Sequence, residues 1–169
     1  MTLIASVSGI RGTIGGEINQ NLTPVDVVAF AAAYGSWIKT KHSSATVVVG
    51  RDARVSGPMV QTLVQQTLVS LGIDVIDVGL STTPTVEMEV VRKQAQGGII
   101  ITASHNPKQW NALKLLNNKG EFISAEAGAE LMQYVSDQSY DFVGVDDLGK
   151  INVVTDALTA HIDAILGLP

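Results

Sequence analysis

Short apolar runs rich in Val, Ile and Leu alternate with amphipathic segments along most of the chain, and this alternation restricts the possible folds more than any other feature. The runs are residues 3–7, 46–49, 74–78, 98–101 and 113–116. Strands that are apolar throughout, rather than at every second residue, are typical of sheets covered on both faces. The pattern therefore predicts an α/β fold of α-β-α layers, with a mostly parallel (mixed) sheet and helices on both faces.

Helix start signals precede several of the amphipathic segments. Thr23 is followed by Pro24 and Asp26, which fit an N-cap, a first-turn proline and the acid of a capping box. The other predicted helices are residues 60–71 ended by Gly72, 83–94, a segment capped by Ser124, and 155–167 capped by Thr155. Residues 139–150, which contain several aspartates, are interpreted as a surface connection.

The length of 169 residues predicts one domain, residues 1–169, because single domains commonly run to about 100–200 residues. Hydrophobic residues make up 46% of the chain and charged residues 16%, which is the composition of a packed protein.

Net charge and targeting signals narrow the classes of partner. The formal charge is −5 and the chain has no run of Lys and Arg, so we expect no nucleic-acid partner. It has no cysteine, no basic start followed by a long apolar stretch, and no apolar stretch of about 18 residues. These features predict a cytoplasmic protein without a membrane partner.

Three loops that follow predicted strands are more polar than a plain turn requires. They are residues 8–12, 50–57 and 102–107. In open α/β sheets ligands bind beyond the carboxyl ends of the strands, so these loops are the first candidates for chemistry.

Arg11 lies between glycines in the first loop. Its guanidinium is suited to paired hydrogen bonds with a phosphate or carboxylate, although a solvated arginine in a glycine-rich turn explains the pattern equally well. The glycine spacing matches neither a dinucleotide-binding fingerprint nor a Walker phosphate loop.

In the second loop, Arg51 and Asp52 are interpreted as an ion pair that fixes the loop, and Ser56 as the cap of the next helix. Arg54 has no evident structural partner in this reading.

Ser104 in the third loop is a candidate nucleophile. The nucleophile elbow of α/β-hydrolases needs glycines two residues either side of the serine, where this chain has Thr102 and Asn106. A Ser-x-x-Lys site needs lysine where Pro107 stands. The remaining chemistry is phosphoryl transfer through a phosphoserine, which needs cations around the phosphate oxygens and a group that moves a proton.

The cations available for that chemistry are Arg11, His105, Lys108 and Lys114. For His105 a second interpretation stays open, an imidazole that only hydrogen bonds to a backbone carbonyl.

Three motifs in register resemble one family. Thr102 to Pro107, followed by Asn111 and Lys114, is similar to the active-site serine loop of the α-D-phosphohexomutases, which include phosphoglucomutase, phosphomannomutase and phosphoglucosamine mutase. The Ser8-Gly-Ile-Arg-Gly start and the Gly50-Arg-Asp-x-Arg-x-Ser-Gly loop occur in the family's order. The chain resembles only the first of the family's four domains, so domains 2 to 4, with the aspartate-rich metal loop, are expected to be absent from it.

The resemblance implies an isomerase of carbohydrate metabolism that interconverts hexose 1-phosphate and hexose 6-phosphate through a bisphosphate. Ser104 would be the phosphorylated residue, His105 would support proton transfer, and Arg11 and Lys114 would bind the substrate and act in catalysis, with Lys114 as cation and proton mover. Mg²⁺ would be bound mainly by domain 2, with a phosphoryl oxygen on Ser104 as the one ligand from this chain.

Further partners follow from the same resemblance. Hexose 1,6-bisphosphate would serve as intermediate and activator, a phosphosugar as substrate, and the other domains of the polypeptide as partners. We expect a fragment that is inactive alone, with 162–169 leading to the second domain. The alternative is a non-catalytic binding domain that retains the fold.

One position departs from the family pattern: Ala112 stands where the family usually has glycine. If the backbone there needs a positive φ, alanine would shift Lys114. The residues that would select glucose, mannose or glucosamine phosphate lie in the domains expected to be absent.

Overall fold

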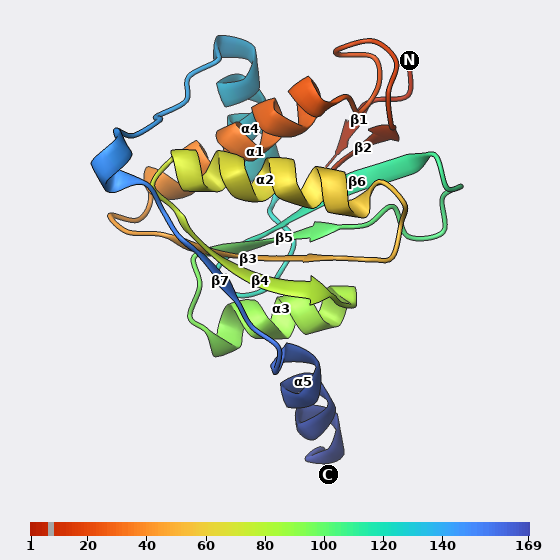
Figure 1. The fold of residues 1–169 in the computed structure, drawn as a ribbon, viewed down its shortest axis with the longest axis vertical. Helices are drawn as coiled ribbons and strands as arrows, with labels where there is room; N and C mark the ends of the chain where they lie inside the picture. Colours follow the sequence, from red (N-terminus) through yellow and green to blue (C-terminus); the bar gives the residue numbers. More distant parts are fainter. Residues whose placement is uncertain (7–8) are drawn as a thin grey trace.

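A seven-stranded sheet forms the centre of the molecule in the computed structural model, which describes residues 1–6 and 9–169 (Figure 1). The strand order is β1-β2-β6-β5-β3-β4-β7. The strands are β1 (Ile4–Ser6), β2 (Gly9–Thr13), β3 (Thr46–Arg51), β4 (Asp74–Leu80), β5 (Gly97–Ile101), β6 (Trp110–Leu116) and β7 (Ile151–Val153). The fold is α/β with a mixed sheet, as the sequence predicts.

Helices cover both faces of this sheet (Figure 1). Helices α1, α2 and α4 lie on one face, and α3 lies on the other with α5 projecting beyond it. The helices are α1 (Pro24–Lys39), α2 (Gly57–Ser70), α3 (Thr83–Arg92), α4 (Ala125–Asp137), a short 3-10 turn η1 (Val145–Asp147) and α5 (Ala157–Leu166).

The two faces of the sheet pack into separate apolar cores, which explains the uninterrupted apolar runs. Val47 and Val49 of β3 pack in the core beneath α1 and α2, whereas Val48 between them packs against α3. Ile99 and Ile100 of β5 divide in the same way. Since successive strand residues point to opposite faces, a strand covered on both sides must be apolar at every position.

Parallel pairing is confined to one part of the sheet. Among the described residues, β5, β3, β4 and β7 pair in parallel, while β1, β2, β6 and β5 pair antiparallel. The sequence did not predict β2 as a strand. The predicted strand 3–7 is observed as Ile4–Ser6, and its last residue, Val7, lies outside the described residues together with Ser8.

The predicted helix caps at the starts of α1 and α4 are confirmed. Thr23 and Asp26 form a reciprocal capping box, and Asp26 accepts a hydrogen bond from the Thr23 backbone N–H at 3.0 Å. Ser124 accepts one from the Ala127 N–H at 3.2 Å. Ser56 stands at the N-cap of α2 as predicted but makes no side-chain cap bond, and the predicted cap of α5 was wrong, because its N-cap is Asp156 rather than Thr155.

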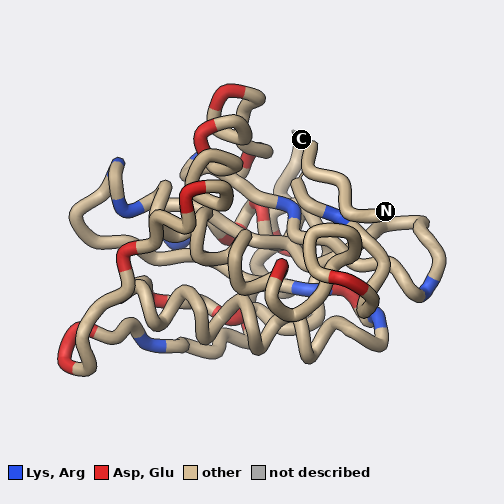
Figure 2. Tube along the Cα trace, turned by 90° about the horizontal axis from the view of Figure 1, so that it is seen from above, with Lys and Arg blue, Asp and Glu red and all other residues tan. Residues whose placement is uncertain are grey.

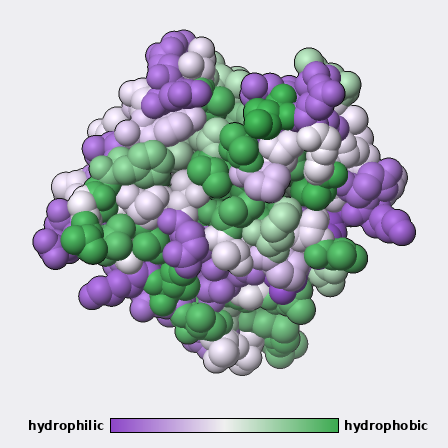
Figure 3. All heavy atoms as spheres, turned by 45° about the horizontal axis from the view of Figure 1, so that its top comes forward, coloured by the Kyte–Doolittle hydropathy of each residue, from purple (hydrophilic) through white to green (hydrophobic). Residues whose placement is uncertain are grey.

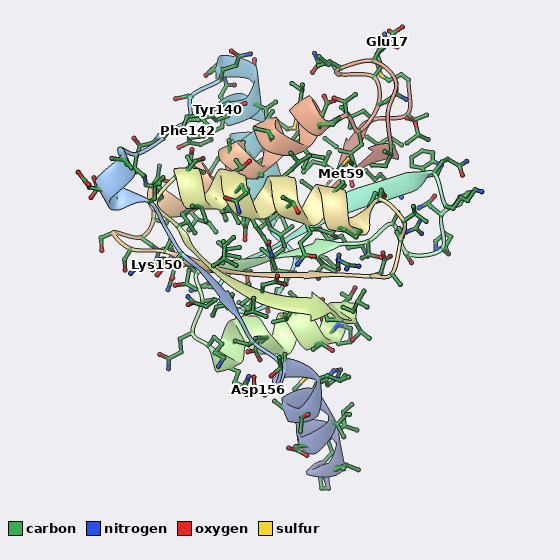
Figure 4. The ribbon with its side chains drawn as sticks, viewed as in Figure 1. Glu17, Met59, Tyr140, Phe142, Lys150 and Asp156 are labelled. Atoms are coloured by element: carbon green, nitrogen blue, oxygen red, sulfur yellow. The ribbon has the colours of Figure 1, made fainter. Side chains whose placement is uncertain are left out.

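Asp156, labelled at the start of α5 in Figure 4, joins that helix to α3. Arg92 donates to both oxygens of Asp156 at 3.0 and 3.1 Å and to both oxygens of buried Glu89 at 2.7 and 2.8 Å. The hydrogen bonds to Glu89 and Asp156 raise the pKa of Arg92, and the bond from Arg92 lowers the pKa of Asp156. A second contact joins Thr85 Oγ1 and His161 Nδ1 at 2.9 Å.

The predicted surface connection, residues 139–150, runs along the outside of the molecule and includes η1. Tyr140 and Phe142, both labelled in Figure 4, meet edge to face with ring centroids 5.9 Å apart.

Charge and apolar groups are dispersed over the surface. In Figure 2, Lys and Arg are spread along the trace among Asp and Glu, and in Figure 3 small apolar groups lie between polar ones. Within the part of the chain that the structure describes, every helix is too short or too polar to cross a bilayer.

Tyr34 anchors α1 to the sheet. Its fully buried hydroxyl donates to the carbonyl of Leu116 at 2.6 Å and lies 3.2 Å from that of Gly98. Burial raises the pKa of Tyr34, so the hydroxyl stays protonated and can donate. The neighbouring residue is Gly97, where a Cβ would collide with this hydroxyl.

We expect Tyr34→Phe to lower the free energy of unfolding by about 1–2 kcal/mol, because it leaves a buried carbonyl without its donor. Urea denaturation followed by circular dichroism measures the change. The matched control is Tyr140→Phe on a half-buried ring, expected to change stability by less than about 0.5 kcal/mol. Equal stability of Tyr34→Phe and the parent would contradict this role.

Candidate functional site

The loops after β3 and β5 emerge side by side because these two strands pair in parallel, with Arg51 opposite Ile101. The Asp52 N–H continues the ladder by donating to the Ile101 carbonyl at 3.1 Å. Beside them, a cleft of about 190 Å³ is lined by residues that include Arg11, Ser104, His105 and Lys114. The structure thus brings together the four residues that the sequence analysis assigned to a site.

Ser104 lies exposed at the tip of the third loop with φ = 55°, in the left-handed region that residues other than glycine seldom adopt. Its Oγ is 3.4 Å from His105 Nδ1, at the outer limit of a hydrogen bond. Asn106 closes the turn, since its backbone N–H and its side-chain amide both donate to the Ala103 carbonyl, at 3.0 and 2.9 Å. This geometry presents the serine hydroxyl and the imidazole together.

Arg11 and Lys114 approach the cleft from the antiparallel part of the sheet. Arg11 is exposed on β2, within a strand rather than in the predicted loop, and it pairs with Ala112 of β6. Lys114 is two residues along β6 and so shares a face with Ala112. Arg11 and Lys114 are therefore diagonal neighbours on one face, within reach of a common anion.

Lys114 is half-buried, and its Nζ lies 5.7 Å from the centre of the Phe122 ring. Lys108, the other predicted cation, lies exposed in the turn before β6. The loop motif that begins at Ser8 has its first residue outside the described part of the chain.

Ala112 is accommodated without strain. It is a buried residue of β6, and its φ is not positive. Its carbonyl accepts a hydrogen bond from the Thr102 N–H at 3.1 Å, which ties the serine loop to β6. An alanine here therefore does not displace Lys114 by backbone strain.

The predicted ion pair between Arg51 and Asp52 is wrong. Arg51 donates from Nε to Gln61 at 2.7 Å and from Nη1 to the Asp52 backbone carbonyl at 3.0 Å. The Asp52 carboxylate instead pairs with Arg54 at 3.2 Å. Ser56, predicted to cap α2, accepts a hydrogen bond from the fully buried Asn111 side chain at 2.9 Å.

Arg54, to which the sequence analysis assigned no partner, contacts the serine loop more extensively than any of the residues predicted to form the site. Its guanidinium donates to the backbone carbonyls of Ser104, Asn106, Pro107 and Trp110 at 2.8–3.0 Å. An arginine without a local partner, on a loop beside the serine loop, was the available signal.

The described residues do not form a metal site of their own. No group of three or more His, Cys, Asp or Glu side chains among them is arranged to hold a metal ion. The carboxylate that contacts the serine loop, Asp52, is engaged by Thr102 and Arg54.

A family model described as phosphoglucomutase/phosphomannomutase, alpha/beta/alpha domain I, matches residues 3–141. The phosphoglucomutase/phosphomannomutase of Thermococcus kodakarensis is 34% identical over 157 residues, which cover 91% of this chain and 34% of the relative. The phosphoglucosamine mutase of Leuconostoc mesenteroides is 34% identical over 163 residues, covering 92% of this chain and 34% of the relative. The chain thus spans about a third of the length of these relatives.

Solved structures of similar proteins share the fold. A phosphoglucomutase/phosphomannomutase family protein from Burkholderia thailandensis superposes with a TM-score of 0.78 at 24% identity, over 97% of this chain and 36% of that one. Parafusin, a phosphoglucomutase from Paramecium, gives 0.75 at 16% identity, over 100% of this chain and 36% of its own. At these identities the likeness concerns the fold.

Because Ala112 adopts ordinary strand geometry, we expect Ala112→Gly to destabilise the protein by about 0.5–1 kcal/mol through the entropy of the unfolded chain. Thermal denaturation of the variant and its parent measures this. If glycine stabilised the protein instead, the backbone at this position would be strained.

Proposed function

Because the chain belongs to the phosphoglucomutase/phosphomannomutase family as its α/β/α domain I, we propose that it is the phosphoserine-bearing domain of a phosphohexomutase. The reaction interconverts hexose 1-phosphate and hexose 6-phosphate through a hexose 1,6-bisphosphate. The observation that carries the proposal is the cleft in which exposed Ser104 meets His105, Arg11 and Lys114. A hydroxyl surrounded by cationic and proton-moving groups suits phosphoryl transfer, in which positioning and charge stabilisation supply most of the catalysis.

In the proposed step a hydroxyl of the sugar monophosphate attacks the phosphorus of phosphorylated Ser104. The bond from phosphorus to the serine Oγ breaks, a bond to the sugar oxygen forms, and Oγ receives a proton while the sugar hydroxyl loses one. The bisphosphate turns over in the site and returns its other phosphate to the serine by the reverse of this step. Atoms and charges balance without any further reactant.

Three side chains of the cleft supply the remaining roles. Lys114 provides positive charge and moves a proton near the reacting hydroxyl. Arg11, its diagonal neighbour, binds and orients the phosphate through its planar guanidinium. His105, whose Nδ1 lies beside the serine Oγ, supports proton transfer to and from that oxygen.

We also propose that an oxygen of phosphorylated Ser104 would be the one ligand that this chain supplies to a Mg²⁺ ion, which would provide positive charge to neutralise the phosphoryl oxygens. The described residues contain no set of carboxylates for the rest of its coordination. Residues 1–169 are proposed to act as one domain, together with further domains of the same polypeptide that bring the other metal ligands and select the sugar.

The principal test of the function is the phosphorylation of Ser104. We expect the full-length gene product to gain one phosphate per chain after treatment with glucose 1,6-bisphosphate, measured by intact mass spectrometry. Ser104→Ala removes the accepting hydroxyl, so both this phosphate and mutase activity are lost. Ser43→Ala, on an exposed serine outside the cleft, is the matched control and keeps both. Full activity of the Ser104→Ala enzyme would refute the proposal.

We expect the 169 residues alone to turn over glucose 1-phosphate at least about 10³-fold more slowly than the full-length gene product, because the groups proposed to position sugar and metal belong to the further domains. A coupled assay of glucose 6-phosphate formation measures both rates at equal concentration. Equal rates would show that the chain holds the whole active site.

A further inference from the structure

We propose that Arg54 is a positioning residue for Ser104, and that Arg54, Asp52 and Thr102 act as one unit, here called the Arg54 clasp. The clasp holds Ser104 in its left-handed backbone conformation, from which the hydroxyl faces the cleft. This inference rests on the proposed function of Ser104 and extends it to Thr102, which also lines the cleft, and to Asp52 and Arg54, which do not.

The guanidinium of Arg54 uses all five of its N–H donors within the protein. Nη2 donates to the carbonyls of Ser104 and Asn106, both at 2.8 Å. Nη1 donates to those of Pro107 and Trp110 at 2.9 and 3.0 Å. Nε donates to the Asp52 carboxylate at 3.2 Å.

Because every N–H donor of Arg54 has a partner within the protein, two roles for Arg54 can be distinguished: binding of substrate and support of the serine loop. An arginine that bound a substrate phosphate would keep some of its N–H groups directed at the ligand. A guanidinium has only five N–H groups in total. All five are engaged by the loop and by Asp52. The Arg54 side chain is also only 11% exposed, so its charge is largely withdrawn from solvent. Its contacts therefore serve the loop rather than the substrate.

The other side of Ser104 is held through Thr102. The Ser104 N–H donates to Thr102 Oγ1 at 3.0 Å, and the Thr102 hydroxyl donates to Asp52 Oδ2 at 2.6 Å. Asp52 Oδ1 accepts from the Arg54 backbone N–H at 3.0 Å. The contacts form a closed ring from Arg54 through Asp52 and Thr102 to Ser104 and back to Arg54.

The ring matters because the conformation it fixes is one that serine does not favour. With φ = 55°, Ser104 needs surrounding contacts to keep it there. The clasp engages both its N–H and its C=O, the two backbone groups that would reorient if φ changed. Loss of the clasp would move the hydroxyl away from the reacting phosphorus without removing any group that binds the sugar.

The test uses two substitutions in the full-length gene product. Arg54→Lys keeps the charge but replaces a planar fork with one point of donation, which cannot reach four carbonyls. Thr102→Val keeps the shape of a buried side chain and removes its hydroxyl. For each we expect kcat to fall about 10- to 100-fold, with KM changed less than about twofold, because misplacement of a reacting group by about 1 Å costs rate rather than affinity.

Two controls separate positioning from general damage. Arg92→Lys removes the same fork geometry from an arginine bound to two carboxylates between α3 and α5, and we expect its kcat to stay within twofold of the parent. Thr102→Ser restores a hydroxyl and should recover most of the activity lost in Thr102→Val. If Arg54→Lys does not fold, the pair at Thr102 carries the test.

Hydrogen exchange at the Ser104 amide gives a readout independent of catalysis. We expect faster exchange in Thr102→Val, where the acceptor of the Ser104 N–H is gone, and also in Arg54→Lys, where that acceptor is kept and the bonds from Arg54 to the loop carbonyls and to Asp52 have changed. Unchanged exchange in Arg54→Lys, unchanged kcat in both variants, or a higher KM at constant kcat would overturn the clasp. A Ser104→Ala enzyme of full activity would instead refute the proposed function itself. In that case the hydrogen-exchange result alone would decide whether the Arg54 clasp holds Ser104.

Discussion

The parallel pairing of β3 with β5 is the constraint on which the candidate site depends. It places Arg51 opposite Ile101, so the loops that follow leave the same edge of the sheet together, and Asp52 extends the ladder by one further bond. From that position the side chain of Arg54 reaches the carbonyls of the serine loop. The two strands are far apart in sequence, and the sheet brings their ends together before any side chain contributes chemistry.

The fold class could be predicted because the residue types in the strands indicate directly that the strands are buried on both faces. A strand such as β3, apolar at every position, has few alternatives to the centre of a covered sheet, and caps such as Thr23 with Asp26 act locally. The antiparallel part was harder to predict. β2 has the sequence Gly-Ile-Arg-Gly-Thr, which reads as a turn, and it becomes a strand because β1 and β6 lie on either side of it. Pairing of that kind is a tertiary effect that a local pattern does not record.

The same distinction separates the contacts at the candidate site that could be predicted from those that could not. Ser104, His105 and Lys114, which line one cleft, were predicted from a loop after a strand and from a motif, both of which are local features of the sequence. The predicted partner of Asp52 was wrong because Arg51 is engaged by Gln61 and by the Asp52 backbone carbonyl, whereas Arg54, two residues beyond Asp52 in the loop, reaches the carboxylate. The carbonyls that Arg54 binds belong to backbone that any residue type could supply, so no sequence pattern marks them.

The left-handed conformation of Ser104 has a consequence for the evolution of this loop. Threonine carries the same hydroxyl and forms the same phosphate ester, yet a β-branched side chain is a poor fit to positive φ. Backbone geometry, rather than the reactivity of the oxygen, then accounts for serine at the position proposed to be phosphorylated. A threonine would become acceptable there only if the loop first relaxed to a different turn, and such a change would need compensating changes on the neighbouring β3 loop.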